Sequence, residues 1–310
     1  MKNVYIAGIG AIGSMIASRL QKNCRLKVIV DAGRKKRYSE EGIYVNDEKY
    51  DFDYITPDDT EPPADLLIIA VKNRHLEQVI ETVRSFVGKN TSILSLLNGI
   101  DSEQIIGSQF GMEHMLYSFI VATDSVRVKN RTNYTNVGKI VFGEKNSEIT
   151  PRVTAVKTLL ERSGIGVEVP CDITREIWWK FMLNVGINQT SAVLRAPYGV
   201  YQKSESARSL MRNACMEVLN IAQKKKINLT NEDIDNYFRI INGLAANGKT
   251  SMLQDVEAGR GTEVETFAGA VIRMGKELDI PTPVNEILYA MIKTIEGTYE
   301  SSILFQGRNI

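Results

Sequence analysis

Apolar residues in the first half of the chain gather in short continuous runs, separated by longer segments in which apolar and polar residues mix. Continuous runs of this length predict strands that are buried on both faces of a parallel sheet. The expected strands span residues 2–8, 26–30, 66–71 and 92–97, with shorter ones between 116 and 143, and the expected helices span 14–21, 75–86 and 150–163. Alternation of strands and helices predicts an α/β domain.

The second half of the chain has a different pattern, because its apolar positions recur with the spacing of a helix face. The expected helices span residues 174–194, 206–225, 231–245, 262–278 and 283–299. The stretch 164–172 contains Pro170 and separates the two patterns, so it is the expected boundary. The sequence therefore predicts an α/β domain over residues 1–171 and an all-helical domain over residues 172–310.

Composition narrows the choice of partners and of chemistry. The 38 Lys and Arg residues balance 37 Asp and Glu residues, which leaves no net charge to attract nucleic acid or an anionic membrane. There is no charged leader followed by an apolar run, and no run approaches the roughly 18 apolar residues of a membrane span, so we expect a cytoplasmic protein. Three scattered cysteines and two histidines offer little for a disulfide framework, a metal site or a Ser-His-Asp triad. Catalysis is therefore expected from lysine and carboxylates.

A glycine-rich segment follows the first expected strand. Gly8-Ile9-Gly10-Ala11-Ile12-Gly13 leads directly into the first expected helix. This order of strand, glycine loop and helix lets backbone amides and a helix N-terminus hold a diphosphate. The second strand ends at Asp31, where dinucleotide-binding proteins often place an acid that binds the ribose, although a turn residue explains it equally well.

Two further expected strands end in polar residues. Lys72 follows the strand at 66–71, and Asn98 follows the strand at 92–97. Each alone is readily explained as a surface lysine or a turn asparagine. Ligands of open α/β sheets collect at the carboxyl ends of the strands, so two such endings favour a binding site.

The helix expected at 174–194 carries polar residues within an apolar sequence. Lys180, Asn184 and Asn188 recur every four residues and therefore share one face, while their neighbours are Trp, Phe, Met, Leu, Val and Ile. A carbonyl substrate would satisfy these groups, with the lysine as proton donor and the amides as orienting groups. The alternative is a solvated helix face, which the apolar neighbours disfavour.

Two clusters near the C-terminal end complete the candidates. Ser251-Met252-Leu253-Gln254-Asp255 precedes Gly261, and Thr262 and Glu265 have the spacing of a capping box at the start of a helix. Glu263 lies between them. It is either a favourable acid in the first helical turn or a carboxylate that pairs with Lys180 and keeps the ammonium in place.

Taken together, these motifs resemble the series found in the ketopantoate reductases, also called 2-dehydropantoate 2-reductases. The resemblance rests on Gly8, Gly10 and Gly13, Val71-Lys72, Asn98-Gly99, Trp179-Lys180-Phe181 with Asn184 and Asn188, Ser251-Met252-Leu253-Gln254-Asp255 and Thr262-Glu263. It covers residues 2 to 295 and implies a Rossmann-type N-terminal domain with a doubly wound parallel sheet, a helical C-terminal domain and an active site between them. It also implies NADPH-dependent reduction of ketopantoate to pantoate on the route to pantothenate and coenzyme A.

The resemblance assigns roles to individual positions. Lys180 matches the general acid and Glu263 the acid that supports the site, while the positions that match substrate contacts are Asn98, Asn184, Asn188 and Ser251. The positions that match cofactor contacts are Gly8, Ile9, Gly10, Ala11, Ile12, Gly13, Lys72, Asn98, Ala122 and Glu263. One position departs, because Tyr198 stands where the family has a substrate-binding asparagine.

The choice of cofactor depends on the end of the second strand. The family places an arginine there for the 2′-phosphate of NADPH, whereas this chain has Asp31, followed by Arg34, Lys35 and Lys36. An acid at this point suits NAD, while Arg34 could still bind the phosphate. We therefore expect NADP, with NAD as the alternative.

Two other functions stay open on the sequence alone. Asp31 and Tyr198 would suit an NADH-dependent reductase of branched-chain 2-oxo acids, a 2-hydroxyacid dehydrogenase. A non-catalytic nucleotide-binding module is the remote alternative, since fold alone does not give function. In the catalytic readings the partner is a small 2-oxo acid. The apolar faces of the helical half could also support a homodimer, although the domain's own core needs the same faces.

Overall fold

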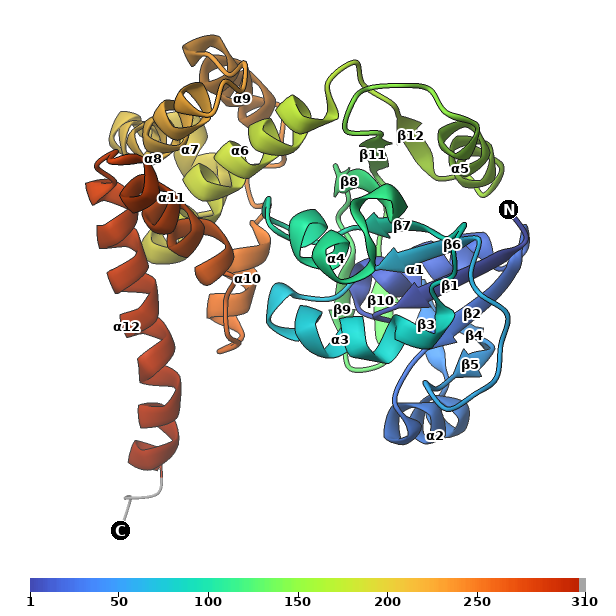
Figure 1. The fold of residues 1–310 in the computed structure, drawn as a ribbon. Coiled ribbons are helices and arrows are strands. Elements are labelled where there is room, and N and C mark those ends of the chain that lie inside the picture. Colours follow the sequence, from blue (N-terminus) through green and yellow to red (C-terminus); the bar gives the residue numbers. More distant parts are fainter. Residues whose placement is uncertain (307–310) are drawn as a thin grey trace. The chain divides into compact units, whose positions relative to one another are not determined.

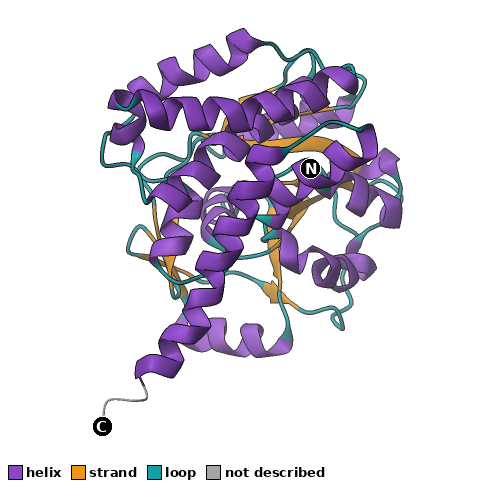
Figure 2. Ribbon diagram, turned by 90° about the vertical axis from the view of Figure 1, so that its left-hand side faces the viewer, coloured by secondary structure: helices purple, strands orange, loops and turns teal. Residues whose placement is uncertain are grey.

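The computed structural model describes residues 1–306, and the chain divides between Thr174 and Arg175 into two compact units (Figure 1). The sequence-based boundary, between residues 171 and 172, lies three residues earlier. All the strands, orange in Figure 2, belong to the first unit. Each unit has its own core and is described by itself.

An eight-stranded sheet forms the centre of the first unit, with the strand order β12-β11-β8-β7-β6-β1-β2-β5. The strands are β1 (Asn3–Ala7), β2 (Arg25–Ile29), β5 (Tyr54–Ile55), β6 (Leu66–Ile69), β7 (Ser92–Ser95), β8 (Met115–Val121), β11 (Lys139–Gly143) and β12 (Gly166–Glu168). Pairing is parallel from β5 to β8, whereas β11 runs antiparallel to β8. The expected α/β fold is confirmed, with a mixed sheet, because no helix crosses over between β8 and β11.

Helices cover both faces of this sheet, and alternate residues of β1 point to the two sides. Val4 and Ile6 belong to a core that also contains residues of α1 (Ala11–Leu20) and α5 (Pro151–Arg162). Tyr5 and Ala7 belong to a second core with residues of α3 (Leu76–Val83) and α4 (Ser102–Phe110). A strand buried on both faces explains the continuous apolar run at the start of the sequence.

A helix and two strands of a small second sheet in this unit have no counterpart in the sequence-based prediction. The helix α2 spans Ala32–Glu41, and the sheet has the order β4-β3-β10-β9. Its strands are β3 (Ile43–Val45), β4 (Glu48–Tyr50), β9 (Val126–Val128) and β10 (Arg131–Asn133). Of these, β3 and β4 were not expected, whereas β9 and β10 lie in the range 116–143 where short strands were expected. Tyr38 is the one buried side chain of α2, so the helix has no apolar stripe for a pattern to reveal.

The described residues of the second unit, up to 306, form helices and no strand, as expected. The helices are α6 (Ile173–Leu194, which begins in the first unit), α7 (Tyr198–Lys203), α8 (Glu205–Lys224), α9 (Asn231–Asn242), α10 (Ser251–Glu257), a π-helix (Glu265–Gly269), α11 (Ala270–Leu278) and α12 (Pro283–Gln306). The buried carboxylate of Glu217 on α8 accepts hydrogen bonds from Val284 N at 2.7 Å and Asn285 N at 3.0 Å. These contacts satisfy amides at the N-terminus of α12.

The helix expected at 262–278 is present over residues 265–278, but its expected start at Thr262 and its capping box are wrong. The helical part begins with the π-helix at Glu265, and α11 follows. Thr262 donates from both N and Oγ1 to Oε1 of Glu296, at 2.7 Å each. The carboxylate of Glu265 instead accepts from the Tyr289 hydroxyl at 2.8 Å. A carboxylate from α12, distant in sequence, thus takes the place expected of Glu265.

Short 3₁₀ turns at Asn73–His75, Arg84–Phe86 and Met112–His114 complete the described structure. Within residues 1–306, no helix has both the length and the apolar character needed to cross a bilayer.

Candidate active site

The glycine loop joins β1 to α1 and has the geometry of a dinucleotide-binding loop. Gly8 has φ +101°, a conformation that favours glycine. A Cβ atom on Gly13 would lie 1.8 Å from the carbonyl oxygen of Gly8, so only glycine lets the helix start this close to the strand. Gly10 is exposed, and a Cβ atom there would meet nothing within 4 Å. The loop therefore leaves space at its backbone amides, as a bound diphosphate requires.

The end of β2 carries the residues that bear on cofactor choice. Asp31 is the N-cap of α2, where its Oδ1 accepts from Arg34 N at 2.7 Å. Its Oδ2 lies 3.3 Å from Nη1 of Arg34, and both side chains are more than half exposed. The sequence indicates either a turn residue or a ribose-binding acid at Asp31, and the structure makes it the N-cap of a helix that was not predicted. Because its charge is balanced by Arg34, Asp31 repels a neighbouring phosphate less than an unpaired acid would.

Other cations gather near Arg34. Burial lowers the pKa of His75, and the positive charges of Arg74, Arg34 and Lys72 lower it further. Three cations, Arg34 on α2 and Lys72 and Arg74 in the segment after β6, therefore lie near His75.

Four predicted site residues follow the carboxyl ends of four adjacent strands. Gly8 follows β1, Lys72 follows β6, Asn98 follows β7 and Ala122 follows β8, and these strands are parallel neighbours. Asn73 Nδ2 donates to the carbonyl oxygen of Asn98 at 2.7 Å, which ties two of the strand-end loops together. Ala122 is exposed and left-handed, with φ +59°. The structure thus brings these predicted residues to one edge of the sheet.

In the second unit, α6 presents the predicted polar row. Lys180 and Asn184 are half-buried, and Asn188 is 5% exposed. The intervening residues Phe181, Met182, Leu183, Val185 and Ile187 are all buried. The row is therefore bordered by core side chains, which argues against a fully solvated helix face.

The amides of this row differ from a neighbouring amide on the same helix. Gln189 is fully buried, and its Nε2 donates to Val185 O at 2.8 Å and to Asn285 Oδ1 at 3.0 Å. Within the described part of the chain, the side-chain amides of Asn184 and Asn188 have no such partner. Neither Asn184 nor Asn188 has a polar side-chain atom that is fully buried without a partner, so their amides reach solvent and are accessible to a polar ligand, whereas the buried Oε1 of Gln189 has no partner among the described residues.

Thr250, the residue before Ser251, connects Ser251 to the helix that carries this row. Thr250 is the N-cap of α10 and accepts from Leu253 N at 3.2 Å. Its hydroxyl is also 2.5 Å from the hydroxyl of Ser191, whose Oγ donates to Asn188 O. This contact places the start of α10 against α6 and was missed by the sequence analysis. Its one signal is Thr250 itself, a good N-cap residue before an apolar pair.

Two other predicted positions are only partly defined. Glu263 is half-buried and directly precedes the turn into the π-helix, and its backbone carbonyl accepts from Phe267 N at 3.1 Å. An ion pair between Glu263 and Lys180 stays a prediction. Tyr198 donates its N–H to Gly248 O at 3.0 Å, and burial raises the pKa of its hydroxyl. It therefore lies beside the loop that leads to Ser251.

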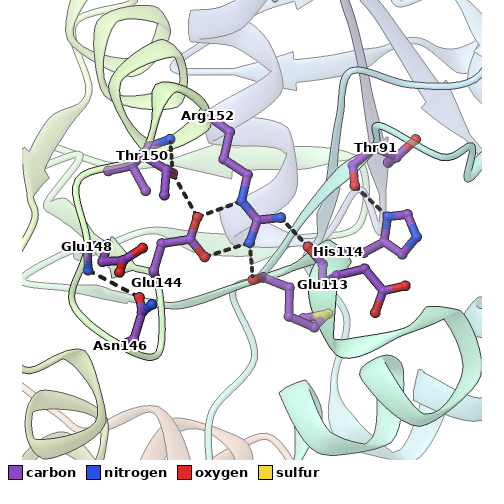
Figure 3. Close-up of polar contacts among 10 residues, drawn as sticks. Thr91, Glu113, His114, Glu144, Asn146, Glu148, Thr150 and Arg152 are labelled. Atoms are coloured by element: carbon purple, nitrogen blue, oxygen red, sulfur yellow. Dashed lines mark hydrogen bonds and ion pairs between the residues drawn. The ribbon is translucent and has the colours of Figure 1, made fainter.

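A second group of ionisable residues, at the start of α5, is structural (Figure 3). The carboxylate of Glu144 accepts from Thr150 Oγ1 and Arg152 Nε, both at 2.7 Å. Burial acts to raise the pKa of Glu144, but the hydrogen bonds from Arg152 and Thr150 outweigh it, so the pKa is lowered. A carboxylate held in this way stays ionised in its ion pair and is a poor proton donor. Among the side chains that the structure describes, those of residues 1–299, no group of three or more His, Cys, Asp or Glu is arranged to hold a metal ion.

Two family models match the chain. The model described as Ketopantoate reductase PanE/ApbA matches residues 4–147, and the model Ketopantoate reductase PanE/ApbA C terminal matches residues 172–296. Among curated proteins, an uncharacterized oxidoreductase YkpB of Bacillus subtilis is 26% identical over 94% of this chain and 98% of its own length. A 2-dehydropantoate 2-reductase of Streptococcus pyogenes is 26% identical over 95% and 98%.

Solved structures show the same fold. A PanE/ApbA family ketopantoate reductase from Ralstonia eutropha has a TM-score of 0.84 at 23% identity, covering 97% of this chain and 100% of that one. A dimeric ketopantoate reductase from Staphylococcus aureus has a TM-score of 0.78 at 20% identity, covering 96% and 99%. A D-mandelate dehydrogenase with NADH and anilino(oxo)acetate has a TM-score of 0.83 at 22% identity, covering 97% and 100%.

Proposed function

The chain belongs to the ketopantoate reductase family of nicotinamide-dependent oxidoreductases, and we propose that it reduces ketopantoate (2-dehydropantoate) to pantoate with NADPH. The observation that carries the proposal is the row of Lys180, Asn184 and Asn188 on α6, an ammonium and two amides bordered by buried apolar side chains. Relatives named 2-dehydropantoate 2-reductase support the choice of substrate.

The mechanism follows from where charge develops. When bound at the glycine loop, the nicotinamide cofactor supplies a hydride to the ketone carbon. Negative charge then grows on the ketone oxygen, and the Lys180 ammonium stabilises that oxygen and donates a proton to it. Asn184, Asn188 and Ser251 orient the polar groups of the substrate, together with Asn98 at the end of β7. Glu263 supports the ammonium.

NADPH is favoured by the charges at the end of β2. Asp31 is engaged as the cap of α2 and balanced by Arg34, while Arg34, Lys72 and Arg74 all bear on His75. A 2′-phosphate bound here would lie near several cations, and the carboxylate of Asp31 is already paired with Arg34. Arg34→Ala should raise the KM for NADPH by about 10- to 100-fold and leave the KM for NADH nearly unchanged. Lys36→Ala, another exposed cation of α2, is the matched control.

A second candidate is an NADH-dependent reductase of another 2-oxo acid. Tyr198 stands where the family has a substrate-binding asparagine, and a protein of the same fold is a D-mandelate dehydrogenase with NADH. An aromatic side chain at this position would reshape the part of the site that holds the far end of the substrate.

The deciding experiment is the initial rate of ketopantoate reduction with NADPH and NADH side by side, alongside a panel of branched and aromatic 2-oxo acids. The proposal predicts the highest kcat/KM for ketopantoate with NADPH. A higher kcat/KM for another 2-oxo acid, or a preference for NADH, would replace it with the second candidate.

The assembly that fits the proposal is a homodimer in the cytoplasm. Ile287 and Met291 lie one turn apart on α12 and are 61% and 45% exposed, which gives this helix an uncovered apolar strip. The Staphylococcus aureus protein of the same fold is dimeric. Multi-angle light scattering should give twice the chain mass, and Ile287→Glu should reduce it to one.

A further inference from the structure

The small sheet of the first unit contacts the glycine loop through its side chains. Nη1 of Arg127, on β9, donates to the carbonyl oxygen of Ile9, the second residue of the loop. Just before this strand, Ser125 Oγ donates to Ala11 O at 3.0 Å. On β10, Thr132 Oγ1 lies 2.7 Å from the hydroxyl of Ser14. Two side chains of the small sheet, and a third just before it, thus form hydrogen bonds with the loop and the first turn of α1.

Arg127 has an unusual setting for an arginine. Its side chain is half-buried, its Nε donates to Lys129 O at 2.8 Å, and its guanidinium lies 5.9 Å from the centre of the Tyr38 ring. The ionisable groups that act on its charge are Tyr38, Tyr54 and Arg37, and no carboxylate pairs with it among residues 1–299, whose side chains the structure describes. Removing a cation from water without an anionic partner costs free energy. The stability of the loop alone therefore does not account for an arginine at this position.

The two carbonyl contacts determine which way the loop's amides point. In a planar trans peptide, the C=O and the N–H of the next residue point in opposite directions. A donor that fixes the carbonyl of Ile9 therefore turns the N–H of Gly10 to the other side, at a residue where an added Cβ atom would also meet nothing within 4 Å. Ser125 likewise donates to the carbonyl of Ala11, the first residue of α1, and so supports the direction that the helix already gives to this carbonyl and to the N–H of Ile12. Donation to a carbonyl also polarises the peptide and strengthens its N–H as a donor.

We propose that the small sheet is a clamp on the glycine loop, and that Arg127 is its main positioning residue, which orients the loop's amides toward the diphosphate of a dinucleotide. The inference rests on the proposed function only in requiring that this loop binds a nicotinamide dinucleotide. Arg127 touches the loop and not the reacting atoms, so its effect is on affinity and not on the chemical step.

The test compares Arg127→Gln with Arg131→Gln, a matched control on the same sheet. Arg131 also lies over a tyrosine ring, 4.1 Å from the centre of Tyr44, but it pairs with Asp47 at 3.5 Å. Dissociation constants are measured for NADPH, NADH and adenosine 2′-monophosphate, which has no diphosphate. Arg127→Gln should weaken NADPH and NADH by the same factor, about 10- to 100-fold, and leave the monophosphate and the kcat at saturating NADPH nearly unchanged. Arg131→Gln should bind all three like the wild type.

Ser125→Ala provides a second, milder variant that removes one hydroxyl. It should weaken both dinucleotides by about 2- to 10-fold. Unchanged affinity of both variants for NADPH would overturn the proposal. An equal loss for the monophosphate would also overturn it, because that result indicates general damage to the unit. If the wild type binds NADPH but reduces no 2-oxo acid, the proposed function fails while the clamp is still tested by the binding data.

Discussion

At the scale of single residues, Lys180 is the group on which the proposed chemistry depends. Lys180→Ala should lower kcat by on the order of 100-fold or more, because the developing oxyanion loses its proton donor. Affinity for NADPH should stay unchanged, since the glycine loop lies in the other unit. Lys224→Ala, at the exposed end of α8, is the control and should keep full activity. Stopped-flow turnover and a fluorescence titration separate the two effects, and a kcat near that of the wild type would remove Lys180 from the mechanism.

Asn184 and Gln189 make a second comparison, since both are amides on α6. Asn184→Ala should raise the KM for the 2-oxo acid by about 2- to 10-fold with little change in kcat, because a neutral hydrogen bond to the substrate is lost. Gln189→Ala should instead lower the temperature of unfolding, because Gln189 bonds to Val185 and Asn285 inside the core. Steady-state kinetics and thermal melts of both variants check this. An Asn184→Ala protein with unchanged KM contradicts its role.

Local spacing explains which residues of the candidate site could be predicted. The loop at residues 8–13 and the row on α6 are regular in sequence, so their geometry follows from the loop and helix that contain them. Contacts between distant segments give no such pattern. Arg127 meets Ile9 across 118 positions, and Thr250 meets Ser191 across 59. Both contacts depend on tertiary packing that a single sequence does not reveal.

At the scale of elements, the open space beside Gly10 gives a sharp test of the loop. Gly10 has φ −74°, which any residue adopts, and an added Cβ meets nothing within 4 Å. Gly10→Ala should therefore fold normally yet weaken NADPH by at least about tenfold, because the methyl group occupies the space of the diphosphate. Gly297→Ala, a similarly open glycine on α12, should have no effect on binding. Calorimetric titration of both proteins checks it, and wild-type affinity of Gly10→Ala would place the cofactor elsewhere.

Helices and strands could be predicted where their buried residues form a run or a periodic pattern of apolar residues in the sequence, and were missed where they do not. The strands β1, β6 and β7 are buried on both faces and appear in the sequence as apolar runs. Helix α2 buries Tyr38 alone, and the missed strands β3 and β4 have three residues each. The segment at 262–278 has helical spacing, but Glu296 and Tyr289 of α12 bind the residues that should have started the helix. Tertiary contacts override the local preference there.

At the scale of the whole molecule, the division into two units allows the stabilising effect of a bound ligand to be assigned to one of them. NADPH at about 100 times its Kd should stabilise the unit that binds it by about 2.7 kcal/mol. For the 174 residues of the first unit, this corresponds to a rise of about 5–10 °C in unfolding temperature. Calorimetry detects the unfolding of both units, whereas the fluorescence of Trp178 and Trp179 reports the unfolding of the second unit. Adenosine should produce no shift, and a calorimetric trace that NADPH leaves unmoved would exclude binding to the first unit.

The place of β1 in the sheet also has a consequence for how the chain is made. β1 lies between β2 and β6, and the carboxylate of Asp65 accepts from the backbone N–H groups of Lys2 and Asn3 at 2.6 and 3.0 Å. During synthesis, β1 therefore acquires β2 as a neighbour early and lacks the other neighbour until residues 66–69 are synthesised. During that interval a nascent chain exposes an apolar strand edge, the kind of edge that pairs with other chains. A pause in translation before residue 66 would prolong this exposure and increase the need for a chaperone.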